Sequence, residues 1–259
     1  MQVSFWKYQG AGNDFVMIDN RNGFFSPNAL SIKRLCNRQF GIGADGLICL
    51  ETAPDADFAM VYFNADGNES TFCGNGGRCI VAFATELGLV NTNQKARFRA
   101  KDGFHLAWWE GDFIALQMKN VDRVEQQGND YILDTGSPHF VRFTNEVASL
   151  PVPTLGAEIR YNKQFENEGI NVNFVQQKSG STIFVRTYER GVEDETLSCG
   201  TGVTASAIAA ALKGMPSPIQ VQTPGGDLQV SFLREESGFE NVVLTGPATL
   251  VFKGTIELF

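Results

Sequence analysis

Two cysteines stand in the same local context in the two halves of this 259-residue sequence. The stretch that ends in Cys73-Gly-Asn-Gly matches the stretch that ends in Cys199-Gly-Thr-Gly with one inserted residue. Each stretch has Glu four positions before its cysteine and starts with an aromatic and a polar residue, Phe63-Asn64 and Tyr188-Glu189. We interpret the match as an internal repeat of about half the chain. It predicts two similar domains that each contribute one cysteine.

Each Cys-Gly-x-Gly stretch opens an apolar segment, which predicts a helix that begins at the cysteine. The positive end of a helix lowers the pKa of a thiol, and its unpaired N–H groups bind a carboxylate. Two such helix starts facing each other across a cleft would hold one carboxylate between two thiols. This geometry suits removal of a proton from one face of a carbon and delivery of a proton to the other. A cysteine is otherwise a small buried hydrophobe, which is how we interpret Cys36, Cys49 and Cys79.

The remaining elements must position these two helix starts. We predict helices over residues 27–38, 74–87 and 200–212, the last two stopped by Gly88 and Gly214. Most predicted strands follow one another without a helix between them. We therefore expect an α+β fold of two pseudo-symmetric domains, each a mixed or antiparallel sheet around a central helix, with the active site in the interdomain cleft. The expected domains are residues 1–118 with a returning strand at 248–259, and residues 119–247.

Composition excludes several classes of function. With 21 basic and 29 acidic residues the net charge is −8, which disfavours nucleic acids and anionic membranes as partners. No apolar stretch approaches the roughly 20 residues of a spanning helix, and the first residues lack the apolar core of a signal peptide. Five dispersed cysteines argue against a disulfide framework, and no His, Cys or Asp cluster has metal-ligand spacing. We expect a soluble cytoplasmic protein without a metal site.

At this point the ordered motifs resemble one family across essentially the whole chain. The sequence is similar to the diaminopimelate epimerases, cofactor-independent enzymes that interconvert L,L- and meso-2,6-diaminopimelate. The motifs that carry the resemblance are Gly10-Ala-Gly-Asn-Asp-Phe15, Gly41-Ile-Gly-Ala-Asp-Gly46, Phe63-Asn64 with Cys73-Gly-Asn-Gly-Gly-Arg78-Cys79, Gly136-Ser-Pro-His139, Glu189-Arg190-Gly191 with Cys199-Gly-Thr-Gly, and Pro224-Gly-Gly226.

The resemblance implies a role for each matching residue. Cys73 and Cys199 match the catalytic pair, one a thiolate base and the other a thiol acid. The residues that match substrate-binding groups are Asn13, Asn64, Gly74, Asn75, Asn171, Glu189, Arg190, Gly200 and Thr201, while His139 and Ser137 are possible supporting residues. The resemblance also implies an amino-acid substrate, no cofactor, a cleft that closes on substrate, and a homodimer.

Two residues of this set have a direct chemical interpretation, and three positions depart from the family. Arg190 can form two hydrogen bonds to a carboxylate and Glu189 can accept from an ammonium group, so together they could recognise the distal end of an amino acid. Ser137 stands where the family usually has Asn. The loop before Cys199 has one extra residue. Gly46 stands where some members have Gln.

Several alternatives remain open from the sequence. The closest is a related cofactor-independent racemase of the proline or hydroxyproline type. A thiol hydrolase that pairs one cysteine with His139 leaves the repeat unexplained. The Gly41–Gly46 run fits a dinucleotide fingerprint but leads into a strand instead of a helix. A non-catalytic binding module is a further alternative, and which cysteine is the resting thiolate is undecided.

Overall fold

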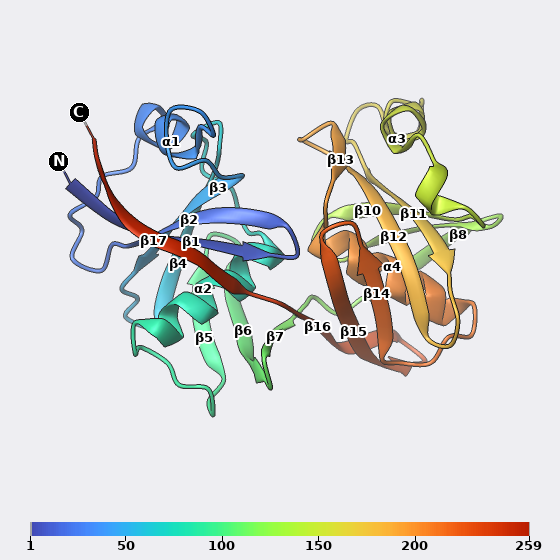
Figure 1. Ribbon diagram of the computed structural model, residues 1–259. Coiled ribbons are helices and arrows are strands. Elements are labelled where there is room, and N and C mark those ends of the chain that lie inside the picture. Colours follow the sequence, from blue (N-terminus) through green and yellow to red (C-terminus); the bar gives the residue numbers. More distant parts are fainter. Residues whose placement is uncertain (1, 259) are drawn as a thin grey trace. The chain divides into compact units, whose positions relative to one another are not determined.

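The same succession of paired strands occurs twice along the chain in the computed structural model, which describes residues 2–258 (Figure 1). The chain divides into two compact units. The first consists of the chain up to Leu116 together with the segment from Gly246 onward, and the second is Gln117–Thr245. None of the described helices combines the length and hydropathy needed to cross a membrane.

Strands outnumber helices in both units. The first unit contains β1 (Gln2–Gly10), β2 (Asn13–Asp19), α1 (Ala29–Cys36), β3 (Gly46–Glu51), β4 (Phe58–Asn64), α2 (Gly74–Glu86), β5 (Ala96–Ala100), β6 (Gly103–Glu110), β7 (Phe113–Gln117) and β17 (Thr249–Glu257). The second contains β8 (Val124–Gln127), β9 (Asp130–Asp134), β10 (Pro138–Phe143), a short 3₁₀ turn (Val147–Ser149), α3 (Val152–Arg160), β11 (Asn171–Gln177), β12 (Thr182–Glu189), β13 (Asp194–Thr196), α4 (Gly200–Leu212), β14 (Ile219–Thr223), β15 (Gly226–Glu235) and β16 (Gly238–Gly246).

The strand ladders of the two units have the same sequence of directions. In the first unit β17 and β1, β1 and β2, β3 and β4, β5 and β6, and β6 and β7 pair antiparallel, while β2 and β3, and β4 and β5, pair parallel. The same pattern runs through β8, β9, β10, β11, β12, β14, β15 and β16. Each parallel pair is joined through a helix, as parallel strands require. The predicted α+β fold with mixed sheets and two similar halves is confirmed.

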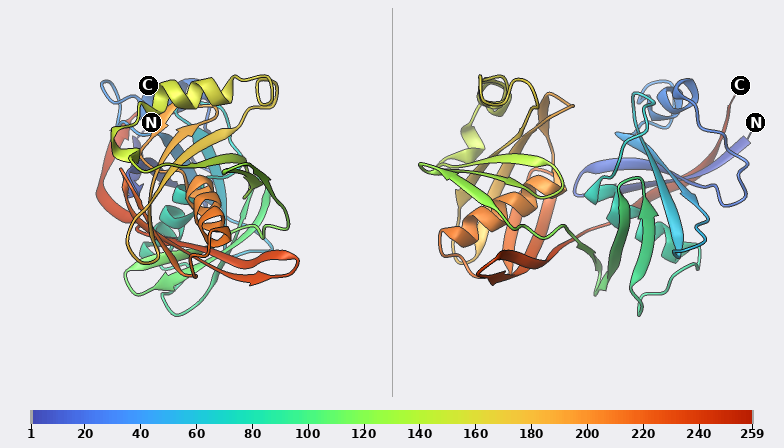
Figure 2. Two further views of the ribbon diagram at one scale, coloured as in Figure 1. Left: turned by 90° about the vertical axis from the view of Figure 1, so that its right-hand side faces the viewer. Right: turned by 180° about the vertical axis from the view of Figure 1, so that it is seen from behind.

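A buried helix lies against the inner face of each sheet. Helix α2 packs on β1, β2, β3 and β6, and α4 packs on β10, β11, β12 and β15 (Figures 1 and 2). Both helices are buried along most of their length, which is why α4 is apolar on all sides. Each ends in a Schellman motif with a left-handed glycine, at Gly88 (φ 72°) and Gly214 (φ 93°). The predicted ends of both helices are thus confirmed.

A second helix covers the outer face of each sheet. The apolar side of α1 packs on the first sheet through Ile32 and Leu35, and that of α3 packs on the second through Val152 and Ile159. The sequence predicted α1 but not α3. Prolines are rare inside helices, and Pro153 interrupts the apolar pattern, yet it falls in the first turn, where the missing N–H has no helical partner to lose.

Candidate functional site

Cys73 occupies the N-cap of α2 in an extended conformation (φ −135°, ψ 121°). The N–H groups of the first helical turn, which follow it, have no partner within the helix. A Cβ on Gly76 would lie 2.8 Å from Ile48 Cδ1, and one on Gly77 would lie 2.7 Å from Phe72 Cζ. These two glycines therefore let α2 pack closely on its surroundings.

The Cys73 thiol contacts Asn13, whose side chain is oriented by a hydrogen bond to Asp45. Cys73 Sγ donates to Asn13 Oδ1 at 3.4 Å, and Asn13 Nδ2 donates to Asp45 Oδ2 at 2.7 Å. Because a carboxylate only accepts, Asp45 holds the NH₂ group of Asn13 on its own side and turns the carbonyl oxygen to Cys73. Arg38 in turn donates to the other oxygen of Asp45 at 2.8 Å. Asp45 lies in the Gly41–Gly46 motif, but no role for it was predicted from the sequence.

We expect Asp45→Ala to lower kcat/KM by roughly 10-fold, because the amide of Asn13 loses its charged acceptor and with it a fixed orientation. The measurement is steady-state kinetics, with the melting temperature as a check on folding. Arg38→Met is the matched control: it removes an exposed cation that pairs with both Asp45 and Asp14, and it leaves the contact between Asn13 and Asp45 in place. Equal kcat/KM for Asp45→Ala and wild type would contradict this role.

The other two candidates in the first unit differ in their surroundings. Asn64 ends β4, pairs through its backbone with Gly46, and has an exposed side chain. Asn75 is 2% exposed in the first turn of α2, where its Oδ1 accepts from Arg78 Nη2 at 2.7 Å. Asn13, Cys73, Gly74 and Asn75 thus gather at one helix start.

Cys199 occupies the N-cap of α4 in nearly the same conformation (φ −115°, ψ 114°). Its Sγ lies 3.4 Å from Thr201 Oγ1, and the carbonyl of Thr201 accepts from Thr135 Oγ1 at 2.8 Å. The Thr201 hydroxyl can donate to sulfur or accept from it, whereas Asn13 Oδ1 only accepts from the Cys73 thiol. The two cysteines therefore have equivalent positions in the repeat and different hydrogen-bonding partners.

Asn173 holds the first turn of α4 against β11, a role that the sequence did not reveal. Its Nδ2 donates to Phe140 O at 3.0 Å and to His139 Nδ1 at 3.1 Å, and its Oδ1 accepts from Thr187 Oγ1 at 2.9 Å. A Cβ on Gly202 would lie 2.3 Å from that same Oδ1. Only glycine therefore allows this close approach of Asn173 to α4. In the first unit, Ile48 of β3 contacts α2 at Gly76 in a similar way.

His139 is completely buried and uncharged. Burial lowers its pKa to about 3, against a raising effect of Asp134. Since Nδ1 accepts from Asn173, the proton of the neutral ring is on Nε2, which has no hydrogen-bond partner in the structure. His139 and Phe15 occupy equivalent positions in the two units. His139 pairs with the first residue of β11, and Phe15 pairs with the first residue of β3.

This burial predicts a pH-dependent stability. The unfolded chain protonates His139 near pH 6.5, whereas the folded protein keeps it neutral down to about pH 3. The folded state therefore loses stability as the pH falls below about 6.5, by up to about 1.4 kcal/mol per pH unit. His139→Phe introduces the residue type found at the equivalent position 15 of the first unit. We expect its melting temperature to decline less than that of wild type between pH 6.5 and 5. Parallel declines in variant and wild type would contradict the neutral buried ring.

The residues expected to recognise the distal end of a substrate lie together in the second unit. Arg190 donates through its backbone N–H to Asn171 Oδ1 at 2.9 Å and through Nη2 to Ser137 Oγ at 3.4 Å. Asn171 Nδ2 donates to Ser137 Oγ at 2.9 Å and to Pro138 O at 3.0 Å. Both hydrogens of the Asn171 amide are thus used within the protein. The serine that departs from the family accepts from both neighbours.

Glu189 precedes Arg190 at the end of β12, and its Oε2 accepts from Thr196 Oγ1 at 3.0 Å. Arg190 is exposed, and its Nη1 donates to Glu168 O at 2.9 Å. A partly exposed carboxylate next to an exposed guanidinium, both tethered by the fold, can bind the ammonium and carboxylate groups of an amino acid.

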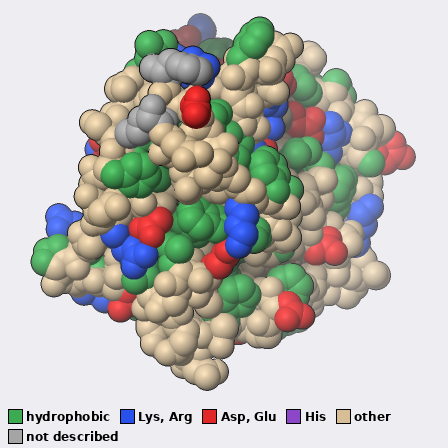
Figure 3. Space-filling model, turned by 60° about the vertical axis from the view of Figure 1, so that its left-hand side comes forward, with side chains coloured by type: hydrophobic (Ala, Val, Ile, Leu, Met, Phe, Trp, Pro, Cys, Tyr) green, Lys and Arg blue, Asp and Glu red, His purple; other side chains and the backbone are tan. Residues whose placement is uncertain are grey.

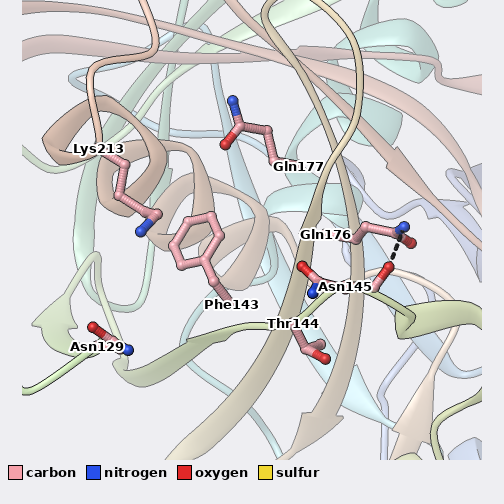
Figure 4. A pocket seen from close by; sticks show the side chains of 7 residues that line it. All are labelled: Asn129, Phe143, Thr144, Asn145, Gln176, Gln177 and Lys213. Carbon is pink, nitrogen blue, oxygen red and sulfur yellow. Dashed lines mark hydrogen bonds between the residues drawn. The ribbon is translucent and has the colours of Figure 1, made fainter.

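Two cavities in the second unit lie elsewhere. Figure 4 shows one of about 300 Å³, lined by Asn129, Phe143, Thr144, Asn145, Gln176, Gln177 and Lys213. Lys213 caps the C-terminal end of α4, so this cavity lies at the opposite end of the helix from Cys199. The other, of about 490 Å³, is lined by Ala148, Phe184, Arg186, Glu195, Thr196, Leu197 and Pro224. Neither is lined by a candidate residue, and among residues 2–258 no three His, Cys, Asp or Glu side chains group as metal ligands.

Comparisons with known proteins identify the family of the chain. The family model described as diaminopimelate epimerase matches residues 5–124 and 131–251. A diaminopimelate epimerase of Flavobacterium psychrophilum is 52% identical over 258 residues, covering 98% of this chain and 100% of that protein. One of Aquifex aeolicus is 40% identical, with 98% of each chain covered.

Solved structures share the fold at much lower identity. A PhzF-family phenazine biosynthesis protein of Bacillus anthracis superposes with a TM-score of 0.79 at 14% identity, covering all of both chains. A hydroxyproline epimerase of Agrobacterium vitis superposes with a TM-score of 0.69 at 12% identity, covering 99% of this chain and 93% of that one. At these identities the likeness concerns the fold alone. From the family model and the relatives at 40–52% identity, the chain belongs to the diaminopimelate epimerase family.

Proposed function

We propose that the chain is an isomerase that interconverts L,L- and meso-2,6-diaminopimelate, in the synthesis of lysine, of peptidoglycan precursors, or of both. The observation that carries the proposal is the pair of cysteines at the N-caps of α2 and α4, equivalent positions of a duplicated fold. Duplication of the whole ladder explains why one chain holds two such sites. A thiol hydrolase would leave one of them without a role.

In the proposed reaction one cysteine thiolate takes the α-proton and the other cysteine delivers its thiol proton to the opposite face of the same carbon. The carbon passes through a carbanion, whose charge spreads into the neighbouring carboxylate. The N–H groups of the two helix starts stabilise that charge. One proton leaves the substrate and one enters it, so the two thiols exchange protonation states in each turnover. The mechanism requires both sulfurs to reach one carbon when substrate is bound.

The distal amino-acid end explains the choice of diaminopimelate over smaller amino acids. Arg190 pairs with the distal carboxylate and Glu189 accepts from the distal ammonium group. Proline and hydroxyproline have no second amino-acid group for these residues to bind. Asn171 and Ser137 hold Arg190 in place. The reaction uses protein groups alone, since neither cysteine motif contains a lysine for a Schiff base.

The test is incubation of the purified protein with L,L-diaminopimelate without added cofactor, followed by chiral chromatography. We expect the meso isomer to form until equilibrium is reached, with no racemisation of proline or trans-4-hydroxyproline. Racemisation of either proline substrate without conversion of diaminopimelate would favour the racemase alternative and contradict the proposal.

We also propose that the enzyme works as a homodimer in the cytoplasm. The mechanism needs reduced thiols, which a reducing compartment maintains. Strand β17 pairs with β1 yet leaves Leu250, Val251 and Phe252 exposed, by 37%, 55% and 46%. Figure 3 views the side with both termini, where hydrophobic side chains (green) reach the surface. A second copy related by a two-fold axis would cover the same residues on both partners.

Sedimentation velocity tests the homodimer. We expect wild type to sediment as a dimer and Val251→Lys as a monomer at low micromolar concentration, because the charge would be buried without a partner. Phe113→Lys, at another exposed hydrophobic position of the same unit (49% exposed), is the control and should remain dimeric. A monomeric wild type, or a dimeric Val251→Lys variant, would contradict β17 as the interface.

A further inference from the structure

Arg78 is a cation enclosed in the second turn of α2, five residues after Cys73. Its side chain is 0% exposed and is the largest among the fully buried ones. Nη2 donates to Asn75 Oδ1 at 2.7 Å, Nε to Pro247 O at 3.3 Å, and Nη1 to Gly74 O at 3.5 Å. Two of these three acceptors belong to the first turn of the helix. The guanidinium therefore lies directly behind the proposed carboxylate-binding start of α2.

Arg78 has no carboxylate partner within the described part of the chain. Its acceptors are amide and carbonyl oxygens, and among residues 2–258 it forms no ion pair with a carboxylate. A buried cation without a counter-ion is costly, and arginine stays protonated inside proteins. Burial lowers the pKa of Arg78, while Cys79 and Cys73 act in the opposite direction. The nearby cysteine sulfurs are thus within its electrostatic range.

The repeat provides an internal comparison. Five residues after Cys199 the chain has Thr204, which is also fully buried and donates to Gly200 O at 2.9 Å. The two helix starts share the partial positive charge of a helix N-terminus. Of these two equivalent buried positions, residue 78 carries a full charge and residue 204 does not. The two helix starts are therefore alike in backbone and differ in the charge at this buried position.

We infer that Arg78 is a positioning residue: it orients the Asn75 amide and places a buried positive charge behind the first turn of α2. As a result, the helix start at Cys73 contributes most of the affinity for the carboxylate at the reacting carbon. This inference rests on the proposed function. It names a group that makes the helix starts at Cys73 and Cys199 unequal in their affinity for the carboxylate. Because Asn75 Oδ1 is held by Arg78, the NH₂ group of Asn75 lies on the other side of the amide. The bound carboxylate supplies the counter-ion that the protein lacks.

A first experiment uses the wild-type protein. The reduced enzyme is alkylated in parallel with iodoacetate, which carries a carboxylate, and with neutral iodoacetamide, and the rates at Cys73 and Cys199 are followed by peptide mass spectrometry. The ratio of the two rates cancels differences in exposure of the thiols. We expect the iodoacetate-to-iodoacetamide ratio to be at least about fivefold larger at Cys73, which corresponds to about 1 kcal/mol of attraction. Equal ratios would overturn the inference.

A second experiment compares variants by steady-state kinetics with L,L-diaminopimelate. We expect Arg78→Met to raise KM about tenfold, Arg78→Lys to recover most of that loss because it keeps the charge, and Thr204→Val to leave KM unchanged. A merely structural role would lower kcat through the folded fraction and leave KM as it was. An unchanged KM in folded Arg78→Met would overturn the inference. If Arg78→Met does not fold, the alkylation experiment is repeated with Arg78→Lys, and equal ratios at both cysteines in that variant would overturn the inference.

The two proposals fail separately. If wild type does not epimerise diaminopimelate, the proposed function falls, while the alkylation ratios still report the charge behind Cys73. If wild type epimerises diaminopimelate and the ratios are equal, only the role of Arg78 falls.

Discussion

Replacing either Cys73 or Cys199 by Ala is expected to lower kcat by at least about 10³-fold. General acid or base groups contribute roughly 10²–10⁴-fold to a rate, and in a two-base mechanism each face of the carbon has one group. Loss of the base prevents proton removal, and loss of the acid leaves the carbanion to recapture its original proton. The measurement is the initial rate of meso-diaminopimelate formation from the L,L isomer.

Cys36→Ala is the control for loss of a buried thiol. Cys36 lies in α1, packs in the core under the first sheet, and is 4% exposed. We expect this variant to lose about 1 kcal/mol of stability and to keep wild-type kcat. Near-normal turnover in Cys73→Ala or Cys199→Ala would contradict their assignment as opposed acid and base. Bound substrate should still raise the melting temperature of both variants, since the helix starts remain.

Arg190→Met is expected to lower kcat/KM by roughly 10²–10³-fold. Removing the guanidinium leaves the distal carboxylate of diaminopimelate without its charged partner, and losing one member of such a hydrogen-bonded pair costs about 2–5 kcal/mol. Binding energy at the distal end also aligns the reacting carbon, so kcat falls together with a rise in KM. The measurement is the full dependence of rate on substrate concentration.

Arg142→Met is the matched control for Arg190→Met. Arg142 lies on β10 in the same unit and pairs with Asp130 at 2.6 Å, with 45% of its side chain exposed. An exposed pair of this kind contributes at most about 1 kcal/mol to stability, and we expect unchanged kinetics. If Arg190→Met retained the wild-type kcat/KM, the distal end of the substrate would have to be bound elsewhere.

The repeat made the helices of the core predictable, whereas elements with weaker local patterns were missed. Helices α2 and α4 begin at a duplicated cysteine motif and end at glycines, so local residues define both ends. Strand β1 was missed although Val3 and Phe5 alternate with exposed residues, because the polar and charged residues around them obscure the alternation. Strands β8 and β13 are short and contain no buried residue, and nothing in their sequences distinguishes them from loops.

For the candidate site, the sequence predicted the residues at the helix starts but not those that hold them. Asp45 and Asn173 act on Asn13 and on the first turn of α4 through contacts between segments about 30 residues apart. Such contacts depend on strand register, which neither residue encodes locally. The charge of Arg78 was visible in the motif, but its complete burial was not, because it follows from the packing of α2 against the segment at Pro247.

The most direct test of two opposed cysteines is the reaction of L,L-diaminopimelate in D₂O, sampled early and analysed by mass spectrometry after chiral separation. The thiol that delivers the proton exchanges with solvent, so the first meso-diaminopimelate formed should carry one deuterium at the inverted carbon, while recovered L,L substrate remains unlabelled. A single base serving both faces would return part of the original proton to the product and would label recovered substrate. Early product without deuterium, or substrate labelled as fast as product, would contradict the two-cysteine mechanism.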